Sequence, residues 1–234
     1  VTWRRYDPEC KVSIVLPVYN GASYLQEAIK SCLAQSHRAL ELIVVDDCST
    51  DETPAIIAEY LHDDPRVVAL RNPKNLRLPE TLNVGFSKAT GDLLTWTSHD
   101  NYYAPSAIEY LVRYLYTWPS IDFAYSDYYT INADGKVIGR AISESPSSLQ
   151  AHNVVGAYFL YRRAVYEGIG KFIPNLEYAE DYDYWVRVYQ QGFKMQHLHA
   201  PLYYYRQHAA SMTEAAKGEL IRKRTQKVQR KHFG

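Results

Sequence analysis

Two adjacent carboxylates, Asp46 and Asp47, have the clearest capacity for chemistry in this chain of 234 residues. They follow the apolar run 42–45, which is typical of a strand buried on both faces of a parallel sheet. Open α/β sheets bind ligands at the carboxyl ends of such strands. Because Ser49 or Thr50 can cap the following helix, one of the two carboxylates is free to accept the N3–H of a uracil-like or thymine-like base. The alternative is that these aspartates form Asx turns or cap the next helix.

Strand and helix patterns alternate over the first hundred residues and position these carboxylates. The predicted strands are 12–18, 41–45, 67–70 and 93–97. Between them, Ser49 and Glu52 form a capping-box pattern that starts one helix, and Pro79 opens another that ends at Gly91. Because the elements alternate in this way, the sequence predicts the α/β class, with a doubly wound and mostly parallel sheet.

The pattern after Asp100 is mixed rather than regularly alternating. The predicted elements are helices at 105–118 and 178–191, strands at 123–131, 155–161, 195–199 and 202–206, and a hairpin turn at 132–135. We find no internal repeat and no low-complexity linker. We therefore expect a single domain over 1–234, with a nucleotide-binding half at about 1–101, a mixed α/β acceptor and catalytic-base half at 102–212, and a basic C-terminal helix at 213–234.

Composition narrows the classes of partner. The 26 basic and 26 acidic residues balance, so the basic footprint of a nucleic-acid-binding protein is absent. Cys10, Cys32 and Cys48 have no CxxC spacing, which argues against a disulfide framework or a structural zinc site and favours a reducing compartment. We find no apolar run of about 18 residues and no signal-peptide pattern, so we expect a cytoplasmic protein. The chain begins at Val1 without a Met, as an excised part of a longer protein would.

The segment 217–231 is strongly basic and is predicted to be helical. Three interpretations are open: a solvated helix, a contact with a partner chain, or a peripheral contact with anionic lipid head groups at the inner face of a membrane. A lipid-linked acceptor would favour the lipid contact.

Two common nucleotide-binding patterns are absent from the sequence. The first strand leads into Pro17, Val18, Tyr19, Asn20 and Gly21, which do not form the GxGxxG of a dinucleotide-binding fold. The GxxxxGK[ST] of a P-loop is absent as well. A nucleotide would therefore be bound by other means.

Several short motifs occur in the order that is typical of one enzyme family. They are SIVLPVYNG at 13–21, VDDCSTD at 45–51, NVG at 83–85, ATGD at 89–92, SHDN at 98–101, EDYDYW at 180–185 and RQH at 206–208. Through these motifs the chain resembles the family 2 glycosyltransferases with the GT-A fold over most of residues 11–212. The resemblance implies transfer of a sugar from a nucleotide diphosphate, with UDP favoured, to a glycan or lipid-linked acceptor. Inversion at the anomeric carbon and a requirement for Mn2+ or Mg2+ are also implied.

The same resemblance implies roles for individual residues. Asp181 would act as the general base, and Asp100 and His208 would hold the metal ion. With residue type considered beside the resemblance, the candidate nucleotide and donor contacts are Pro17, Val18, Tyr19, Asn20, Asp46, Asp47, Arg77, Ser98, His99, Asn101, Glu180, Trp185 and Arg206, with Asp47 favoured for the nucleobase and His99 undecided. Other interpretations stay open for some of them, because acidic residues at 180–183 suit the first turn of any helix, Trp185 has the spacing of a core residue, and Arg77 suits an exposed loop.

Some residues depart from the family pattern. Ser98 and Asn101 stand where aspartates are common in the metal motif, and Leu82 stands where many members have arginine. A catalytically silent nucleotide-sugar-binding module is therefore an alternative. A sugar-phosphate nucleotidyltransferase is another, but it would need a phosphate-binding loop rich in Gly, Arg and Lys after the first strand, which residues 20–23 do not supply.

Overall fold

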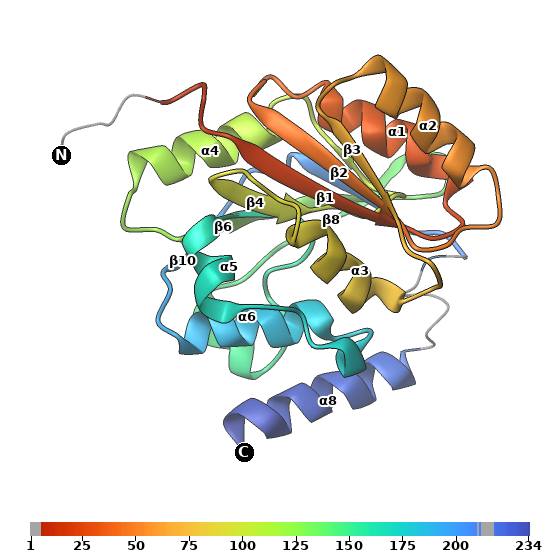
Figure 1. The fold of residues 1–234 in the computed structure, drawn as a ribbon. Helices are drawn as coiled ribbons and strands as arrows, with labels where there is room; N and C mark the ends of the chain where they lie inside the picture. The colour runs from red at the N-terminus through yellow and green to blue at the C-terminus, as the bar shows by residue number, and fades with distance from the viewer. Residues whose placement is uncertain (1–5, 210, 212–217) are drawn as a thin grey trace.

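A seven-stranded sheet forms the centre of the computed structural model, which describes residues 6–209, 211 and 218–234 (Figure 1). In spatial order its strands are β10 (Met195–Leu198), β6 (Phe123–Ser126), β9 (Phe159–Arg162), β4 (Leu93–Trp96), β1 (Val12–Val18), β2 (Leu40–Asp46) and β3 (Val67–Arg71). Neighbouring strands are parallel except at β9, which is antiparallel to both β4 and β6. The predicted mostly parallel, doubly wound sheet is confirmed.

Helices cover both faces of this sheet (Figure 1). Those on one face are α1 (Ala22–Leu33), α2 (Thr53–Asp63) and α4 (Ala107–Thr117), and those on the other are α3 (Arg77–Phe86), α5 (Arg163–Ile169) and α6 (Glu180–Gln190). Side chains of β1 alternate between the two cores, with Ile14 in the first and Val15 in the second. Because both faces are covered, every residue of β1 and β2 is buried.

Close packing of α3 on β1 depends on Gly85. A Cβ added at Gly85 would lie 2.4 Å from the Cγ1 atom of Val15. Since no other residue lacks a Cβ, glycine is needed for α3 to approach the sheet this closely.

A smaller sheet lies beside the large one, and it changes one predicted element. Its strands are β5 (Tyr102–Tyr103), β11 (Tyr203–Arg206), β7 (Tyr128–Ile131) and β8 (Val137–Ala141). The single strand predicted at 123–131 is wrong, because the chain breaks at Asp127 into β6 of the large sheet and β7 of the small one. The hairpin turn predicted at 132–135 is confirmed between β7 and β8, with Gly135 at φ +83°.

Two further predictions differ from the structure in detail. The strand predicted at 155–161 begins only at Phe159, because Gly156 has φ +72°, which a strand does not accommodate. The capping box is wrong, since α2 begins without a side-chain cap and the Ser49 hydroxyl accepts the Asn20 N–H instead. Short 3-10 turns occupy Pro146–Gln150 and Pro174–Leu176.

The basic C-terminal segment forms α8 (Glu219–Phe233), which lies beneath α6 at the bottom of the molecule (Figure 1). The predicted basic helix is confirmed for the described residues, whereas Val1, Met212 and Lys217 lie outside them. Within the described ranges, no helix combines the length and apolarity needed to cross a membrane.

Candidate active site

A cavity of about 730 Å³ opens at the carboxyl ends of β1, β2 and β4. Predicted site residues in its lining are Pro17, Val18, Tyr19, Asn20, Asp47, Arg77, Ser98, His99, Asp100, Asn101, Glu180, Asp181 and His208. Residues that the sequence did not assign also line it, among them Tyr24, Thr81, Tyr128, Tyr205, Ile221 and Thr225. Asp46, Trp185 and Arg206 are not part of the lining.

Asp47 organises the loop at one end of the cavity. Its Oδ1 atom accepts the N–H of Leu76 at 2.8 Å and the side-chain amide of Asn72 at 2.8 Å. Its Oδ2 atom accepts the N–H of Arg77 at 2.9 Å. An ionised carboxylate offers about four lone-pair sites, so one site on Oδ2 is left for a ligand in the cavity.

Asp46 and Trp185, two of the three predicted donor contacts outside the lining, have structural roles elsewhere. Asp46 accepts the N–H of Ser49 at 2.8 Å and pairs with Arg71 at 2.5 Å, so it holds the turn after β2. The Trp185 side chain is completely buried, and its ring centroid lies 4.7 Å from that of Phe159. The open alternative of a core tryptophan matches this placement, because no sugar can reach the buried ring.

Three consecutive backbone N–H groups in the turn after β1 are already engaged by protein side chains. The N–H groups of residues 20–22 donate to the side chains of Ser49, Thr53 and Asp51, respectively. A phosphate-binding loop needs such N–H groups free. This arrangement therefore argues against a nucleotidyltransferase that would hold a triphosphate at this turn.

Asp100 and His208 form a pair inside the cavity that fits a divalent ion. The Oδ2 atom of Asp100 lies 3.0 Å from Nε2 of His208. The Oδ1 atom of Asp100 is buried, and among the described residues no hydrogen-bond partner reaches it. Hard divalent cations take carboxylate oxygens, and imidazole is a frequent additional ligand. An unpartnered buried oxygen beside an imidazole is the donor set that such an ion requires.

Arg206 positions this pair instead of reaching into the cavity. Its guanidinium donates to the carbonyl oxygens of Asp100 at 2.9 Å and Ala133 at 2.7 Å and pairs with Glu27. Its backbone N–H donates to Oδ1 of Asn101 at 2.8 Å. Because the Arg206 side chain is only 2 % exposed and its donors are engaged, it acts on Asp100 and Asn101.

His99 packs beside the same pair and depends on a glycine. A Cβ added at Gly21 would lie 2.4 Å from Cδ2 of His99, so a larger residue would displace the imidazole. Burial lowers the pKa of His99, and the neighbouring His208 lowers it further, while Asp100 acts in the opposite direction. The His99 ring is therefore neutral at pH 7.

Glu180 and Asp181 form the acidic end of the cavity, at the start of α6. Burial raises the pKa of Asp181, whose Oδ2 atom accepts the side-chain amide of Asn153 at 2.9 Å. Burial and the charge of Asp181 raise the pKa of Glu180 to about 8. A pKa of about 8 leaves Glu180 mainly protonated at pH 7. The hydrogen bonds that Asp181 accepts from Asn153 and from the Tyr182 N–H act against the effect of burial and favour its ionised form.

Strained backbone clusters around the cavity. Among the described residues, those other than glycine with positive φ are Asn20, Cys48, Arg77 and Tyr178, at 49°, 67°, 72° and 74°. Three of them line the cavity, and Cys48 follows Asp47. Such conformations cost on the order of 1–3 kcal/mol each and persist where the surroundings hold them.

Helix α8 supplies part of the cavity wall. Ile221 and Thr225 line the cavity, and Val228 is buried against the rest of the protein. The Lys231 ammonium lies 2.8 Å from Oδ1 of Asp183, a buried carboxylate of α6. The sequence signal for this docking is the spacing 221, 225 and 228 on one helical face, which the high charge of the segment obscures.

The fold corresponds to the GT-A fold of solved structures. The chain aligns with the S. aureus TarS fragment 1–349 in complex with UDP-GlcNAc at a TM-score of 0.74 and 20% identity, over 88% of this chain and 61% of that one. It aligns with the mannosyltransferase PcManGT from Pyrobaculum calidifontis, in complex with GDP-Man and Mn2+, at a TM-score of 0.67 and 18% identity, over 90% of this chain and 61% of that one. The chain has the GT-A fold.

Sequence comparison gives the family. Residues 13–170 match the model of glycosyl transferase family 2, and the chain belongs to that family. It is 32% identical over 220 residues to the uncharacterized glycosyltransferase RP339 of Rickettsia prowazekii, covering 89% of this chain and 68% of that protein. It is 27% identical over 216 residues to the Escherichia coli UDP-Glc:alpha-D-GlcNAc-diphosphoundecaprenol beta-1,3-glucosyltransferase WfaP, covering 90% of this chain and 83% of that protein. Across five rickettsial relatives, the matched region spans from 27% to 68% of their length.

Proposed function

We propose that this chain is an inverting, metal-dependent hexosyltransferase that moves a sugar from a nucleotide diphosphate, preferentially UDP, to a hydroxyl of a glycan, glycolipid or protein-linked glycan. The observation that carries the proposal is the shared cavity of Asp47, the Asp100–His208 pair and Asp181. Asp47 suits the nucleobase of the donor, the Asp100–His208 pair suits its diphosphate, and Asp181 suits the acceptor hydroxyl.

Asp181 is the proposed general base. It takes the proton of the acceptor hydroxyl as that oxygen attacks the anomeric carbon and the nucleoside diphosphate departs from the opposite side. One displacement inverts the anomeric centre. Asn153 holds the Asp181 carboxylate in orientation, and protonated Glu180 places no second negative charge beside it.

Asp100 and His208 are the proposed holders of Mn2+ or Mg2+. A divalent ion there would neutralise the charge that develops on the departing diphosphate. Arg206 fixes the backbone of Asp100 and the side chain of Asn101, which keeps the ligand geometry constant.

UDP is the preferred donor carrier in this proposal. The remaining acceptor site on Asp47 suits the N3–H of uracil, with residues 17–20 beside it. The name of the relative WfaP includes UDP-Glc, and TarS was solved with UDP-GlcNAc, which supports the same base. The GDP-Man complex of PcManGT makes GDP the competing possibility that a test must include.

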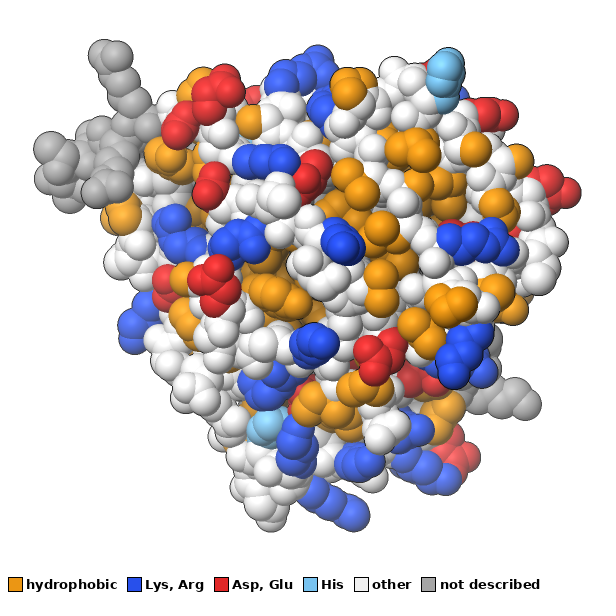
Figure 2. All heavy atoms as spheres, viewed as in Figure 1, with side chains coloured by type: hydrophobic (Ala, Val, Ile, Leu, Met, Phe, Trp, Pro, Cys, Tyr) orange, Lys and Arg blue, Asp and Glu red, His pale blue; other side chains and the backbone are white. Residues whose placement is uncertain are grey.

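We also propose a peripheral membrane contact through α8. Lys and Arg side chains gather at the lower end of the molecule, where α8 lies, as Figure 2 shows. Exposed members on this helix are Arg222, Lys223, Lys227 and Arg230. Such residues attract anionic head groups, and the printed acceptor of WfaP is linked to diphosphoundecaprenol.

Co-sedimentation with anionic vesicles tests the membrane contact. Replacing Arg222, Lys223 and Lys227 by Gln should weaken sedimentation at least tenfold, at about 1 kcal/mol per charge. A matched triple variant at the exposed residues Lys30, Lys74 and Lys88 should bind as the unmodified chain does. Equal binding by both variants would refute the contact.

The transfer reaction is tested by incubation with UDP-, GDP- and TDP-sugars, in Mn2+ or EDTA, with release of nucleoside diphosphate as the readout. We expect release from one UDP-sugar in Mn2+ only, and its loss in Asp181→Asn with nucleotide affinity unchanged. The chain is better described as a silent binding module if it binds nucleotide in calorimetry but releases no nucleoside diphosphate from any nucleotide sugar, with a range of acceptors present.

A further inference from the structure

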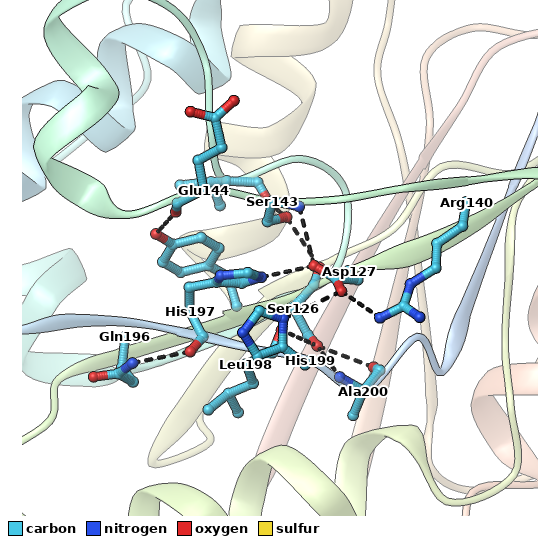
Figure 3. Close-up of polar contacts among 12 residues, drawn as sticks. Ser126, Asp127, Arg140, Ser143, Glu144, Gln196, His197, Leu198, His199 and Ala200 are labelled. Atoms are coloured by element: carbon cyan, nitrogen blue, oxygen red, sulfur yellow. Dashed lines mark hydrogen bonds and ion pairs between the residues drawn. The ribbon is translucent and has the colours of Figure 1, made fainter.

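A second group of potential metal ligands lies at the far edge of the large sheet. Asp127 follows β6, His197 belongs to β10, and His199 follows β10 (Figure 3). One ligand atom from each residue lies within 4.8 Å of the others. Because β6 and β10 are parallel neighbours, with Ser126 opposite Leu198, their carboxyl ends bring these side chains together.

The distances within this cluster are close to those of a metal site. Nε2 of His197 lies 2.6 Å from Oδ1 of Asp127, and Nδ1 of His199 lies 3.6 Å from Oδ2. Ligand atoms about 2.0–2.2 Å from a tetrahedral ion are ~3.4 Å apart. The His199 separation is close to this value, whereas the His197–Asp127 hydrogen bond must open for an ion to bind between the two groups. The His199 side chain is 76% exposed, which leaves a path for the ion and room for water ligands.

The surroundings orient the Asp127 carboxylate, whose side chain is 1% exposed. The backbone N–H of Ser143 donates to Oδ1 at 3.0 Å, as the outer shell of a metal site commonly does. Arg140 donates to Oδ2 at 2.6 Å, and Figure 3 shows it approaching on the side opposite His197. The Arg140 side chain is 43% exposed, so it is free to turn into solvent.

We propose that Asp127, His197 and His199 bind Zn2+ or a similar late first-row divalent ion, with water completing the coordination. Two imidazoles and one carboxylate are the ligands of open zinc sites, and they disfavour Mg2+, which prefers oxygen. Arg140 competes with the ion for the carboxylate, because its positive charge must move away when the ion binds. The cluster lies outside the cavity of the proposed transfer reaction, so the proposal stands apart from that function.

Calorimetric titration of the full chain, stripped with EDTA, with Zn2+ tests the proposal. The titration is run in the Asp100→Asn background, so that the cavity pair does not contribute. We expect one zinc ion per chain, at least a tenfold weaker affinity in His199→Ala, and no heat with Mg2+. His199→Ala is suitable because the side chain is exposed, and His152→Ala, another exposed histidine, is the matched control with unchanged affinity.

A second variant distinguishes a metal site from a charge network. Arg140→Ala should strengthen zinc binding, because it removes the competing cation. The visible absorption of bound Co2+ should report tetrahedral coordination in the unmodified chain and should vanish in His199→Ala. Absence of zinc uptake, or equal affinity in His199→Ala and the unmodified chain, would overturn the proposal.

Discussion

The cavity pair and the edge cluster both combine aspartate with histidine at the carboxyl edge of the sheet, yet they differ in what holds the carboxylate. Asp100 has one buried oxygen to which no described residue donates a hydrogen bond, whereas both oxygens of Asp127 accept protein donors. A metal ion could reach the free oxygen of Asp100 without displacing a protein partner. At Asp127 an ion would have to displace Arg140 first, and water would complete its coordination. The comparison suggests that the same residue types differ in how readily they accept an ion, according to the donors that surround the carboxylate.

The largest expected effect tests whether only the cavity pair acts in transfer. Asp100→Asn should lower kcat/KM at least ~100-fold, because an ion at a developing negative charge contributes several kcal/mol. His199→Ala at the edge cluster should change it less than twofold. Steady-state release of nucleoside diphosphate in saturating Mn2+ measures both. Comparable losses of kcat/KM in Asp100→Asn and His199→Ala would show that the cavity pair is not the only one of the two sites that acts in transfer.

The two sites also use arginine in opposite ways. Arg206→Lys should raise the Mn2+ concentration required for half-maximal transfer about tenfold or more, since outer-shell residues commonly contribute 10–100-fold to metal affinity. High Mn2+ should restore the rate. Arg140→Ala should have no effect on transfer while strengthening zinc binding. If a high Mn2+ concentration fails to restore the transfer rate of Arg206→Lys, Arg206 contributes to transfer in a way other than metal affinity.

Glu180 and Asp181 are an acidic pair that, unlike the two aspartate–histidine sites, is not proposed to bind a metal ion. The Asn153→Ala substitution removes a hydrogen bond that favours ionised Asp181, so the pKa of Asp181, already raised by burial, should rise further. Since the base must be ionised, the acid limb of kcat/KM should move to higher pH by about one unit. The rate at high pH should be kept. His152→Ala changes the preceding residue and is the control, which should leave the acid limb unchanged. An unshifted acid limb in Asn153→Ala would exclude a positioning role for Asn153.

The smallest effect is on thermal stability. Zinc at about ten times its dissociation constant should raise the Tm of the Asp100→Asn chain by about 3–6 °C, because a ligand that binds only the folded state stabilises it. The same zinc should leave the Tm of a chain that also carries His199→Ala unchanged. Differential scanning fluorimetry measures the shift, and equal shifts in both chains would place the ion elsewhere.

Local patterns in the sequence predicted the strands around the cavity well. Strand 12–18 has the same bounds in the structure, and the carboxylates after β2 lie at the expected edge of the sheet. Apolar runs buried on both faces leave little alternative for such segments. The break at Asp127 was missed because 123–131 is continuously rich in strand-forming residues, and only tertiary partners such as Ser143 and Arg140 turn the chain there.

Side-chain roles were harder to predict than elements. Arg206 has the residue type of a phosphate ligand, but its carbonyl partners at 100 and 133 come from distant loops that no local pattern reveals. The cysteine spacing excludes a structural zinc site built on cysteines and carries no information about histidines. The His197–His199 spacing, which places both side chains on one face of a strand, was the available signal.

Helix α8 forms a part of the cavity wall that lies outside the region matching the family model. Its wall residues Ile221 and Thr225 lie beyond the region 13–170 that matches the family model, whereas Asp47 and Asp100 lie within it. The helix is fastened to α6 through Asp183, two residues from Asp181. Exchanging this terminal segment between relatives would therefore change one wall of the cavity while leaving the side chains of Asp47 and Asp100 in place. If the proposed roles hold, acceptor preference would change and donor preference would be kept.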